Sequence, residues 1–281
     1  MSKPFIKWAG GKYRLADKLI QYLPSKFDSS RNTYIEPMVG SGGFFFKHAP
    51  KQAYLSDINE NLINTYNVIK NDVQYLIMKL EVHASKHDAN YFYKMRDKFN
   101  KLVKEKGDPV DIAALFIYLN RTCFNGLYRE NSNGEFNVPI GDYKNPLVAD
   151  IGNLGSVHYL LQDITIKCHG YEHIKPNEGD FVYFDPPYIP LDKTSFTKYS
   201  SDDFVEKDHR KLADFCSKLD DDGVFFMISN SSTKLTKEIY SQFTLKEIQV
   251  MRTIAGSHSK RGMANELIIT NYNNFAQKEL F

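Results

Sequence analysis

The sequence contains no apolar run approaching the ~20 residues that a membrane-spanning helix needs. Its N-terminus also lacks the charged, apolar and small-residue order typical of a signal peptide. Only three cysteines occur, and Cys123, Cys168 and Cys216 lie too far apart for the paired pattern of a zinc site. We therefore expect a cytoplasmic protein with reduced thiols, no membrane partner and no bound metal.

Charge of one sign is not in excess either, because the formal net charge is only +2. Basic residues gather in two stretches: Lys94, Arg96, Lys98, Lys101, Lys104 and Lys106, and Arg252, His258, Lys260 and Arg261. Such runs are typical of solvated helix faces and polar loops, so charge alone does not identify a partner. The 42% of hydrophobic residues is enough for a buried core and argues against disorder.

The order of predicted elements indicates an α/β fold. Near the N-terminus an amphipathic helix (13–23) precedes a strand (33–36), a glycine-rich turn, a second strand (53–56) and a helix (59–69), which is a βαβ order and predicts a parallel sheet. Further strands are predicted at 164–167, 181–184, 224–228 and 267–270, with a helix around 202–219. Residues 72–122 are typical of helices without a strand. We predict a catalytic domain from 1–65 and 150–281, and an inserted, mainly helical domain at 66–149.

The tetrapeptide Asp185-Pro186-Pro187-Tyr188 directly follows the apolar strand FVYF. It is therefore expected at the carboxyl end of a strand, where open α/β sheets bind their ligands. Two prolines also make a stiff strand exit, but a structural turn needs neither an acid before them nor an aromatic after them.

This pattern suits chemistry on a planar amino group, whose lone pair is delocalised into its ring. A carboxylate and a fixed backbone carbonyl can accept the two N–H bonds and free the lone pair. Tyr188 offers a flat face for a base taken out of a helix. We predict Asp185, Pro186, Pro187 and Tyr188 as the catalytic segment.

A glycine loop follows the strand at 33–36 and runs through Glu36, Pro37, Met38, Gly40 and Gly42. The spacing differs from the dinucleotide-binding pattern, and a simple tight turn stays open. Asp57 ends the next strand and is placed to bind a ribose diol, although it could instead be the N-cap of the following helix.

The N-terminal string Lys7-Trp8-Ala9-Gly10-Gly11-Lys12 holds the only tryptophan of the chain. Its glycines allow a ligand to approach the backbone, and Lys12 can pair with a carboxylate. A buried tryptophan beside a turn is the alternative.

Taken together, these strings resemble the Dam-type (D12 class, alpha group) DNA adenine methyltransferases, particularly those that recognise GATC. The matching strings are FIKWAGGK, YIEPMVGSGG, LSDIN, FNGLYRENSNGEFNVPIGDYKNP, FVYFDPPYIPL and ISNSS, which follow the order of the family, and the ending ELIITNY also fits. The chain departs from the family at Gly170-Tyr171, where many relatives have an acid before the aromatic, and at Asp142, where relatives often have a basic residue.

The resemblance implies a Rossmann-like methyltransferase sheet with a helical DNA-recognition insertion. It implies site-specific methyl transfer from S-adenosylmethionine to the 6-amino group of adenine in double-stranded DNA, by base flipping. The cofactor contacts that it implies are Trp8, Gly10, Lys12, Glu36, Pro37, Met38, Gly40, Gly42, Asp57, Ile58, Tyr171 and Asp185. The DNA contacts that it implies are Phe124, Asn125, Leu127, Arg129, Asn137 and Pro139.

Arg129 matches the residue that reads a guanine in the family. An arginine fork fits the N7 and O6 acceptors of guanine, although a phosphate contact is the commoner fate of a DNA-facing arginine. The surrounding Asn and Gly residues suit a hairpin. Phe124 or Tyr128 can fill the gap left by a flipped base.

Two other functions compete with this interpretation. One is methylation of RNA or of a protein amide, because related tetrapeptides act on any planar amino group. The other is a DNA-binding regulator without activity, which would be expected to have lost Asp185 or the glycine loop. A cognate restriction endonuclease is a candidate partner of the predicted enzyme.

Overall fold

The computed structural model describes residues 2–189, 204–252 and 262–275. The chain divides into two compact units, Met1–Ala16 with Val39–Ala49 and Leu55–His169, and Asp17–Met38 with Pro50–Tyr54 and Gly170–Phe281. The predicted division into residues 66–149 and the remainder stays a prediction.

The strands of the second unit form a mixed sheet. These strands are β1 (Tyr34–Glu36), β4 (Phe181–Phe184), β5 (Phe225–Ser231), β6 (Thr244–Arg252) and β7 (Gly262–Thr270). β1, β4 and β5 pair in parallel, whereas β7 pairs antiparallel with both β5 and β6. All four residues of β4 are buried, as expected for a parallel strand covered on both faces.

β2 (Ala53–Asp57) and β3 (Thr165–Cys168) complete the strand order β3-β2-β1-β4-β5-β7-β6. This mostly parallel α/β sheet confirms the predicted fold class. Of the predicted strands, β1, β4 and β5 pair in parallel as expected for a parallel sheet, whereas β7 pairs antiparallel with β5.

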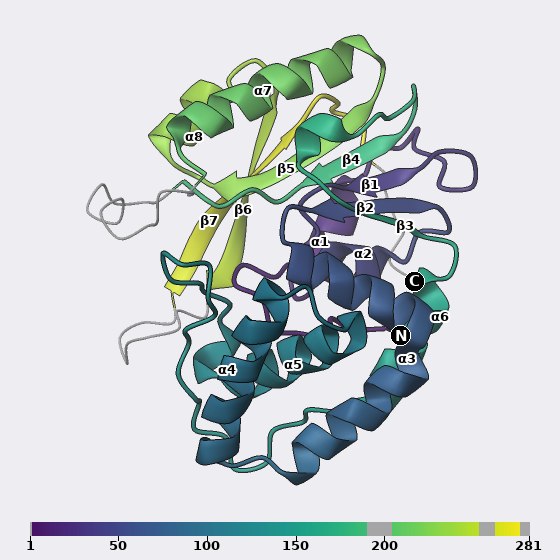
Figure 1. Cartoon of the computed structure of the whole chain (residues 1–281). Helices are drawn as coiled ribbons and strands as arrows, with labels where there is room; N and C mark the ends of the chain where they lie inside the picture. Colours follow the sequence, from purple (N-terminus) through teal and green to yellow (C-terminus); the bar gives the residue numbers. More distant parts are fainter. Residues whose placement is uncertain (1, 190–203, 253–261, 276–281) are drawn as a thin grey trace. The chain divides into compact units, whose positions relative to one another are not determined.

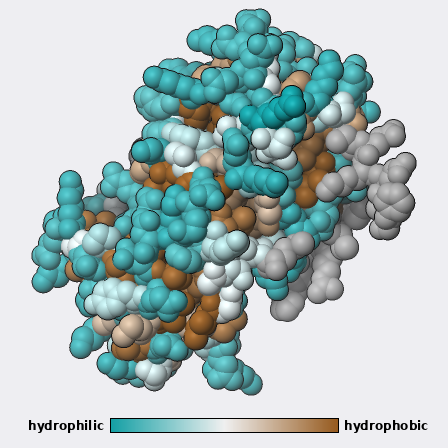
Figure 2. Space-filling model, turned by 90° about the vertical axis from the view of Figure 1, so that its right-hand side faces the viewer, coloured by the Kyte–Doolittle hydropathy of each residue, from teal (hydrophilic) through white to brown (hydrophobic). Residues whose placement is uncertain are grey.

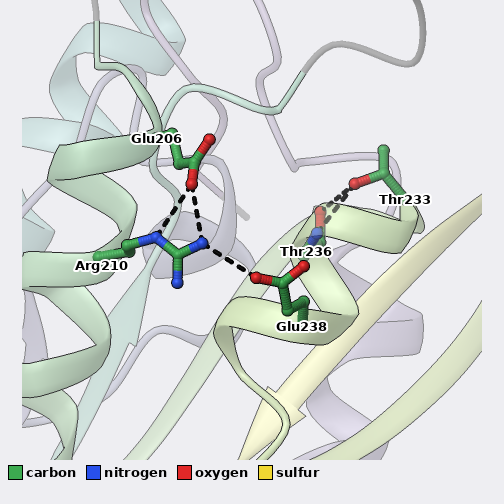
Figure 3. Close-up of polar contacts among 5 residues, drawn as sticks. All are labelled: Glu206, Arg210, Thr233, Thr236 and Glu238. Carbon is green, nitrogen blue, oxygen red and sulfur yellow. Dashed lines mark hydrogen bonds and ion pairs between the residues drawn. The ribbon is translucent and has the colours of Figure 1, made fainter.

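Two helices of the second unit, α7 (Glu206–Asp221) and α8 (Lys234–Ile239), lie beside β4 and β5 (Figure 1). The apolar face of α7 packs against the buried side chains of the sheet, with Leu212 and Cys216 fully buried in one cluster with Phe226. Arg210 joins the two helices by ion pairs to Glu206 at 2.8 Å and Glu238 at 3.0 Å (Figure 3).

The first unit is mainly helical. Its α-helices are α2 (Gly43–His48), α3 (Glu60–Ser85), α4 (Ala89–Lys104), α5 (Pro109–Thr122) and α6 (Ile151–Leu161). α5 packs against α3 and α4 (Figure 1). The side chains of Asn59, Asp88 and Asp108 cap α3, α4 and α5 by accepting backbone N–H groups.

The predicted strands at 33–36, 53–56, 164–167, 181–184, 224–228 and 267–270 are confirmed to within a few residues. The helix predicted at 13–23 is wrong in extent, because α1 covers only Ala16–Leu19 and is followed by a 3₁₀ turn at Ile20–Tyr22. Pro24 explains why the 3₁₀ turn stops at Tyr22, since the residue before a proline is driven out of the helical region and Leu23 is extended.

Hydrophilic residues cover most of the face drawn in Figure 2, with hydrophobic residues between them. Within the described part of the chain, no helix has both the length and the apolar character needed to cross a membrane. The predicted helix around 202–219 begins in residues outside the described ranges. His258, Lys260 and Arg261 of the second basic stretch also lie outside them.

Candidate functional site

The tetrapeptide Asp185–Tyr188 lies at the carboxyl end of β4, as predicted. The register of β4 and β5 pairs Phe184 with Ile228, so the next residue of each strand, Asp185 and Ser229, become neighbours. The Ser229 hydroxyl donates to Asp185 Oδ1 at 3.0 Å. The sheet therefore presents a partly buried carboxylate whose orientation is set by a side chain of the adjacent strand.

Two tyrosine hydroxyls surround this pair. Tyr183 Oη lies 2.9 Å from Ser229 Oγ, and Tyr188 donates to Glu266 Oε2 at 2.9 Å. Burial, followed by the negative charge of Asp185, raises the pKa of both tyrosines well above the ordinary value. Both phenols therefore stay protonated at neutral pH and act as hydrogen-bonding groups.

The chain that leaves the tetrapeptide is also held in place. The Ile189 N–H donates to Asn230 Oδ1 at 3.1 Å, and Ser231 donates to the Ile189 carbonyl. These contacts link the segment after Tyr188 to the end of β5. Both ends of the tetrapeptide are thus attached to rigid strands, which suits a site that must hold one geometry.

We expect Ser229→Ala to lower kcat by about 12- to 150-fold. The hydroxyl holds the Asp185 carboxylate, and losing one neutral-to-charged hydrogen bond costs about 1.5–3 kcal/mol. Single-turnover kinetics measure the effect, and thermal unfolding checks that the variant is folded. Ser232→Ala is the matched control, because the Ser232 hydroxyl donates to the exposed Glu247 and not to Asp185. An unchanged kcat in the Ser229 variant would remove this role.

Glu36 ends β1 and is 2% exposed. Its Oε2 accepts the hydroxyl of Tyr34, whose pKa is raised by burial and by the Glu36 charge. Because β1 pairs with β4, the glycine loop leaves the same sheet edge in the second unit as the tetrapeptide does. The sheet therefore positions the buried Glu36 carboxylate at the start of the glycine loop.

Beyond Met38 the glycine loop belongs to the first unit, where Asp57 shapes it. Asp57 Oδ2 accepts the Gly40 N–H and Asp57 Oδ1 accepts the Asn59 N–H, both at 3.0 Å. Gly40 has φ +47°, a conformation that favours glycine, and its carbonyl accepts the Tyr66 hydroxyl at 3.1 Å. The N-cap of α3 is Asn59, so the alternative that Asp57 caps this helix is wrong.

The N-terminal string meets this loop. A Cβ added to Gly40 would lie 2.8 Å from the Trp8 ring, so only glycine lets the ring come this close. Lys12 is 7% exposed, and its ammonium donates to the Gly10 carbonyl at 2.6 Å. Trp8, Lys12 and Asp57 therefore come together around one glycine loop, although they lie on separate segments.

These residues fit the groups of S-adenosylmethionine. A buried ammonium suits the carboxylate of the amino acid, and the Asp57 carboxylate suits a ribose diol. Ile58 beside Asp57 is 77% exposed and offers apolar surface. Tyr171, in the second unit, packs its ring edge-on against Phe215 at 5.3 Å. Its contact with the cofactor adenine stays a prediction.

The residues predicted to read DNA lie on a hairpin, defined here as residues 122–141. Isolated bridges pair Cys123 with Ile140 and Glu130 with Phe136. The turn is held by Asn131, whose Oδ1 accepts the N–H groups of Asn133 at 2.9 Å and Glu135 at 3.0 Å. The hairpin expected from the Asn and Gly residues is therefore confirmed.

The two candidates for filling the gap of a flipped base differ in exposure. The Phe124 side chain is 50% exposed. Tyr128 instead stacks on Trp8, with ring centroids 5.7 Å apart, and its hydroxyl accepts from Asn61 at 3.2 Å. Phe124 is therefore the more exposed of the two candidates.

A cavity of about 750 Å³ lies between α4 and the hairpin. Its lining mixes cations and carboxylates: Arg96, Lys101, Lys104, Asp97, Glu105 and Glu135. The first basic stretch thus forms part of a groove wall of mixed charge. Among the described residues, no group of three or more His, Cys, Asp and Glu side chains is placed to hold a metal ion.

Sequence reasoning did not single out Ser229, Glu266 or Asn100 as site residues. Ser229 does lie in the string ISNSS, which was the available signal. Glu266 likewise begins the string ELIITNY, whereas Asn100 carries no local pattern, because its contact depends on packing between distant segments.

The comparisons with known proteins agree over nearly the whole chain. Residues 8–254 match the family described as D12 class N6 adenine-specific DNA methyltransferase. The "Type II methyltransferase M1.LlaDCHI" of Lactococcus lactis subsp. cremoris is 40% identical, over 97% of this chain and 96% of its own. The "Type II methyltransferase M.MjaIII" of Methanocaldococcus jannaschii is 42% identical over 96% and 99%. The "DNA adenine methylase" of Escherichia coli K12 is 35% identical over 95% and 94%.

Proposed function

Since the chain belongs to the D12 class of N6 adenine-specific DNA methyltransferases, we propose that it methylates the adenine of GATC in double-stranded DNA after flipping that base out. The observation that carries the proposal is the Asp185 carboxylate at the end of β4, oriented by Ser229. The site-specific adenine-methylating activity follows from the family.

In the proposed reaction, Asp185 accepts one N–H bond of the adenine amino group and a backbone carbonyl near Pro186 accepts the other. This frees the nitrogen lone pair for attack. Proline locks φ and donates no N–H, so the carbonyls of the Pro186-Pro187 segment point in one direction. Tyr188 stacks on the flipped base. The chain acts mainly by positioning, a contribution that reaches about 7–11 kcal/mol at best.

The methyl donor implied by the family is S-adenosylmethionine, which when bound supplies an electrophilic methyl group. We propose that it is held by the residues for which the sequence predicts cofactor contacts, namely Trp8, Gly10, Lys12, Glu36, Pro37, Met38, Gly40, Gly42, Asp57, Ile58, Tyr171 and Asp185. Lys12 pairs with its carboxylate and Asp57 binds its ribose diol. The remaining residues of the loop supply close backbone approach.

Recognition of GATC is proposed to rest on the hairpin. Arg129 is exposed there, and its fork matches guanine O6 and N7. Phe124, Asn125, Leu127 and Pro139 contact the DNA around it. Phe124 and Leu127 are 50% and 37% exposed, which suits apolar contact with bases.

We expect Arg129→Ala to reduce discrimination at the guanine next to the target adenine by about 5- to 150-fold, corresponding to ~1–3 kcal/mol for a bidentate base contact. Overall DNA affinity falls only moderately. The measurement is kcat/KM on GATC and on a duplex altered at that guanine, at two salt concentrations. If Arg129 binds a phosphate instead, all duplexes weaken together and the salt dependence becomes shallower.

The target is tested by sequencing modified bases in DNA from an expressing host that lacks its own adenine methylation. GATC methylation is the expected result, and methylation at an unrelated site would contradict it. Assays of the purified protein on duplex DNA, RNA and protein separate the proposal from methylation of other amino groups.

A cognate restriction endonuclease is proposed as a partner of the system. The support is that two similar proteins carry the name "Type II methyltransferase". The expected finding is a nuclease, encoded nearby, that cleaves the enzyme's target sequence in unmethylated DNA and not in methylated DNA.

A further inference from the structure

We propose that Asn137 is a positioning residue for Arg129, holding its guanidinium so that the two terminal nitrogens face the guanine. The inference rests on the proposed role of Arg129 and deepens it. The resemblance implied a DNA contact for Asn137, whereas the hydrogen bonds of the hairpin point to an action through Arg129.

Two hydrogen bonds join these residues across the hairpin. Asn137 donates its backbone N–H to the Arg129 carbonyl at 3.2 Å. In return, Arg129 donates its Nε–H to Asn137 Oδ1 at 2.8 Å. The backbone contact sets the register of the two strands, and the side-chain contact ties the guanidinium to that register.

Occupation of Nε decides how Arg129 can read a base. A guanidinium binds two adjacent acceptors either side-on, through Nε and one Nη, or end-on, through both Nη atoms. Since Nε–H of this exposed side chain already serves Asn137, the end-on pair is the one left for a base. Guanine presents O6 and N7 side by side in the major groove, which matches the end-on pair.

Asn137 is itself held by α4. Asn100 of α4 donates Nδ2–H to the Phe136 carbonyl at 3.1 Å and accepts the Phe136 N–H with Oδ1 at 2.9 Å. One side chain thus binds both backbone groups of the residue preceding Asn137. The Phe136 ring is 3% exposed and lies edge-on to Phe99, with centroids 6.2 Å apart. The support for Arg129 therefore continues from the hairpin into the helical core.

Preorganisation of this kind lowers the entropy lost on binding. Immobilising one flexible side chain costs about 0.5–1.5 kcal/mol, equivalent to roughly a two- to twelvefold change in binding. We therefore expect Asn137→Ala to lower the specificity ratio by roughly two- to tenfold. The specificity ratio is kcat/KM on GATC divided by kcat/KM on a duplex in which the guanine–cytosine pair beside the target adenine is replaced by adenine–thymine.

The test compares four variants of the full chain by this ratio at two salt concentrations. Asn137→Ala is expected to lower the ratio without changing the salt dependence. Asn137→Asp keeps an acceptor oxygen for Nε–H and is expected to retain the wild-type ratio. Asn100→Ala is expected to lower the ratio less than Asn137→Ala. Asn133→Ala is the control, because Asn133 lies in the same hairpin and is exposed. Where Asn137→Ala does not fold, the contrast between Asn137→Asp and Asn137→Leu gives the same comparison.

Combination with Arg129→Ala separates the inference from the function on which it rests. In that background, Asn137→Ala should leave the ratio unchanged, because the two residues act as one unit. If Arg129→Ala itself leaves the ratio unchanged, the proposed guanine reading fails. If Arg129→Ala lowers the ratio but Asn137→Ala does not, the positioning role alone is overturned. Equal loss on both duplexes with shallower salt dependence would make Asn137 a phosphate contact and also overturn it.

Discussion

Replacing Asp185 by alanine is expected to lower kcat by about 10²–10³-fold, the loss typical when one preorganised hydrogen-bonding partner of a reacting group is removed. The hydrogen bond from the amino group to the carboxylate reaches its full strength only in the transition state, as the nitrogen becomes tetrahedral. Losing an interaction of that kind lowers kcat and kcat/KM together and leaves KM nearly unchanged. Single-turnover methylation of a GATC duplex measures the effect.

Asp185→Asn serves as the graded variant in this experiment. It keeps one acceptor oxygen for the amino group and is expected to lie between wild type and Asp185→Ala. Asp221→Ala is the matched control, since Asp221 is an exposed carboxylate at the end of α7. Circular dichroism and the thermal midpoint establish that each variant is folded. A folded Asp185→Ala protein with wild-type turnover would show that the catalytic assignment is wrong.

Replacing Asp57 by alanine is expected to weaken S-adenosylmethionine binding by about 5- to 150-fold, from ~1–3 kcal/mol for polar groups left unpaired. Two contributions act together. The variant loses the acceptor proposed for the ribose diol, and it also releases the Gly40 and Asn59 N–H groups that Asp57 holds at 3.0 Å. Isothermal titration calorimetry with the cofactor measures the loss.

Asn59→Ala separates a ligand role of Asp57 from a structural one. It removes the N-cap of α3, at a cost of about 1 kcal/mol of stability, but keeps the Asp57 carboxylate. Its cofactor affinity is expected to stay within about twofold of wild type. Asp163→Ala is the surface control, since Asp163 is exposed. If Asn59→Ala weakens binding as much as Asp57→Ala, the backbone structure between β2 and α3, rather than a contact of Asp57 with the ribose diol, accounts for the affinity.

Local patterns were enough to predict most strands and the positions of the candidate motifs. β4 is a run of four apolar residues followed directly by Asp185, so consecutive residues are enough to predict a buried strand that ends at a polar residue. The same holds for the hairpin, because Asn131 and Gly134 carry its turn chemistry within a few positions. β6 was not predicted, because Thr244–Arg252 alternates irregularly between polar and apolar residues and pairs only through β7.

The sequence by itself therefore determined the α/β class and the family, and it located the candidate site residues, because each is encoded in short strings. Only the tertiary structure decided which side chains support them. Ser229 reaches Asp185 across 44 positions through the β4–β5 register, and Asn100 reaches Phe136 across 36 positions. It likewise decided that Asn59 rather than Asp57 caps α3. Such contacts arise from strand register and helix packing, and the periodicity of a single segment does not encode the register between two.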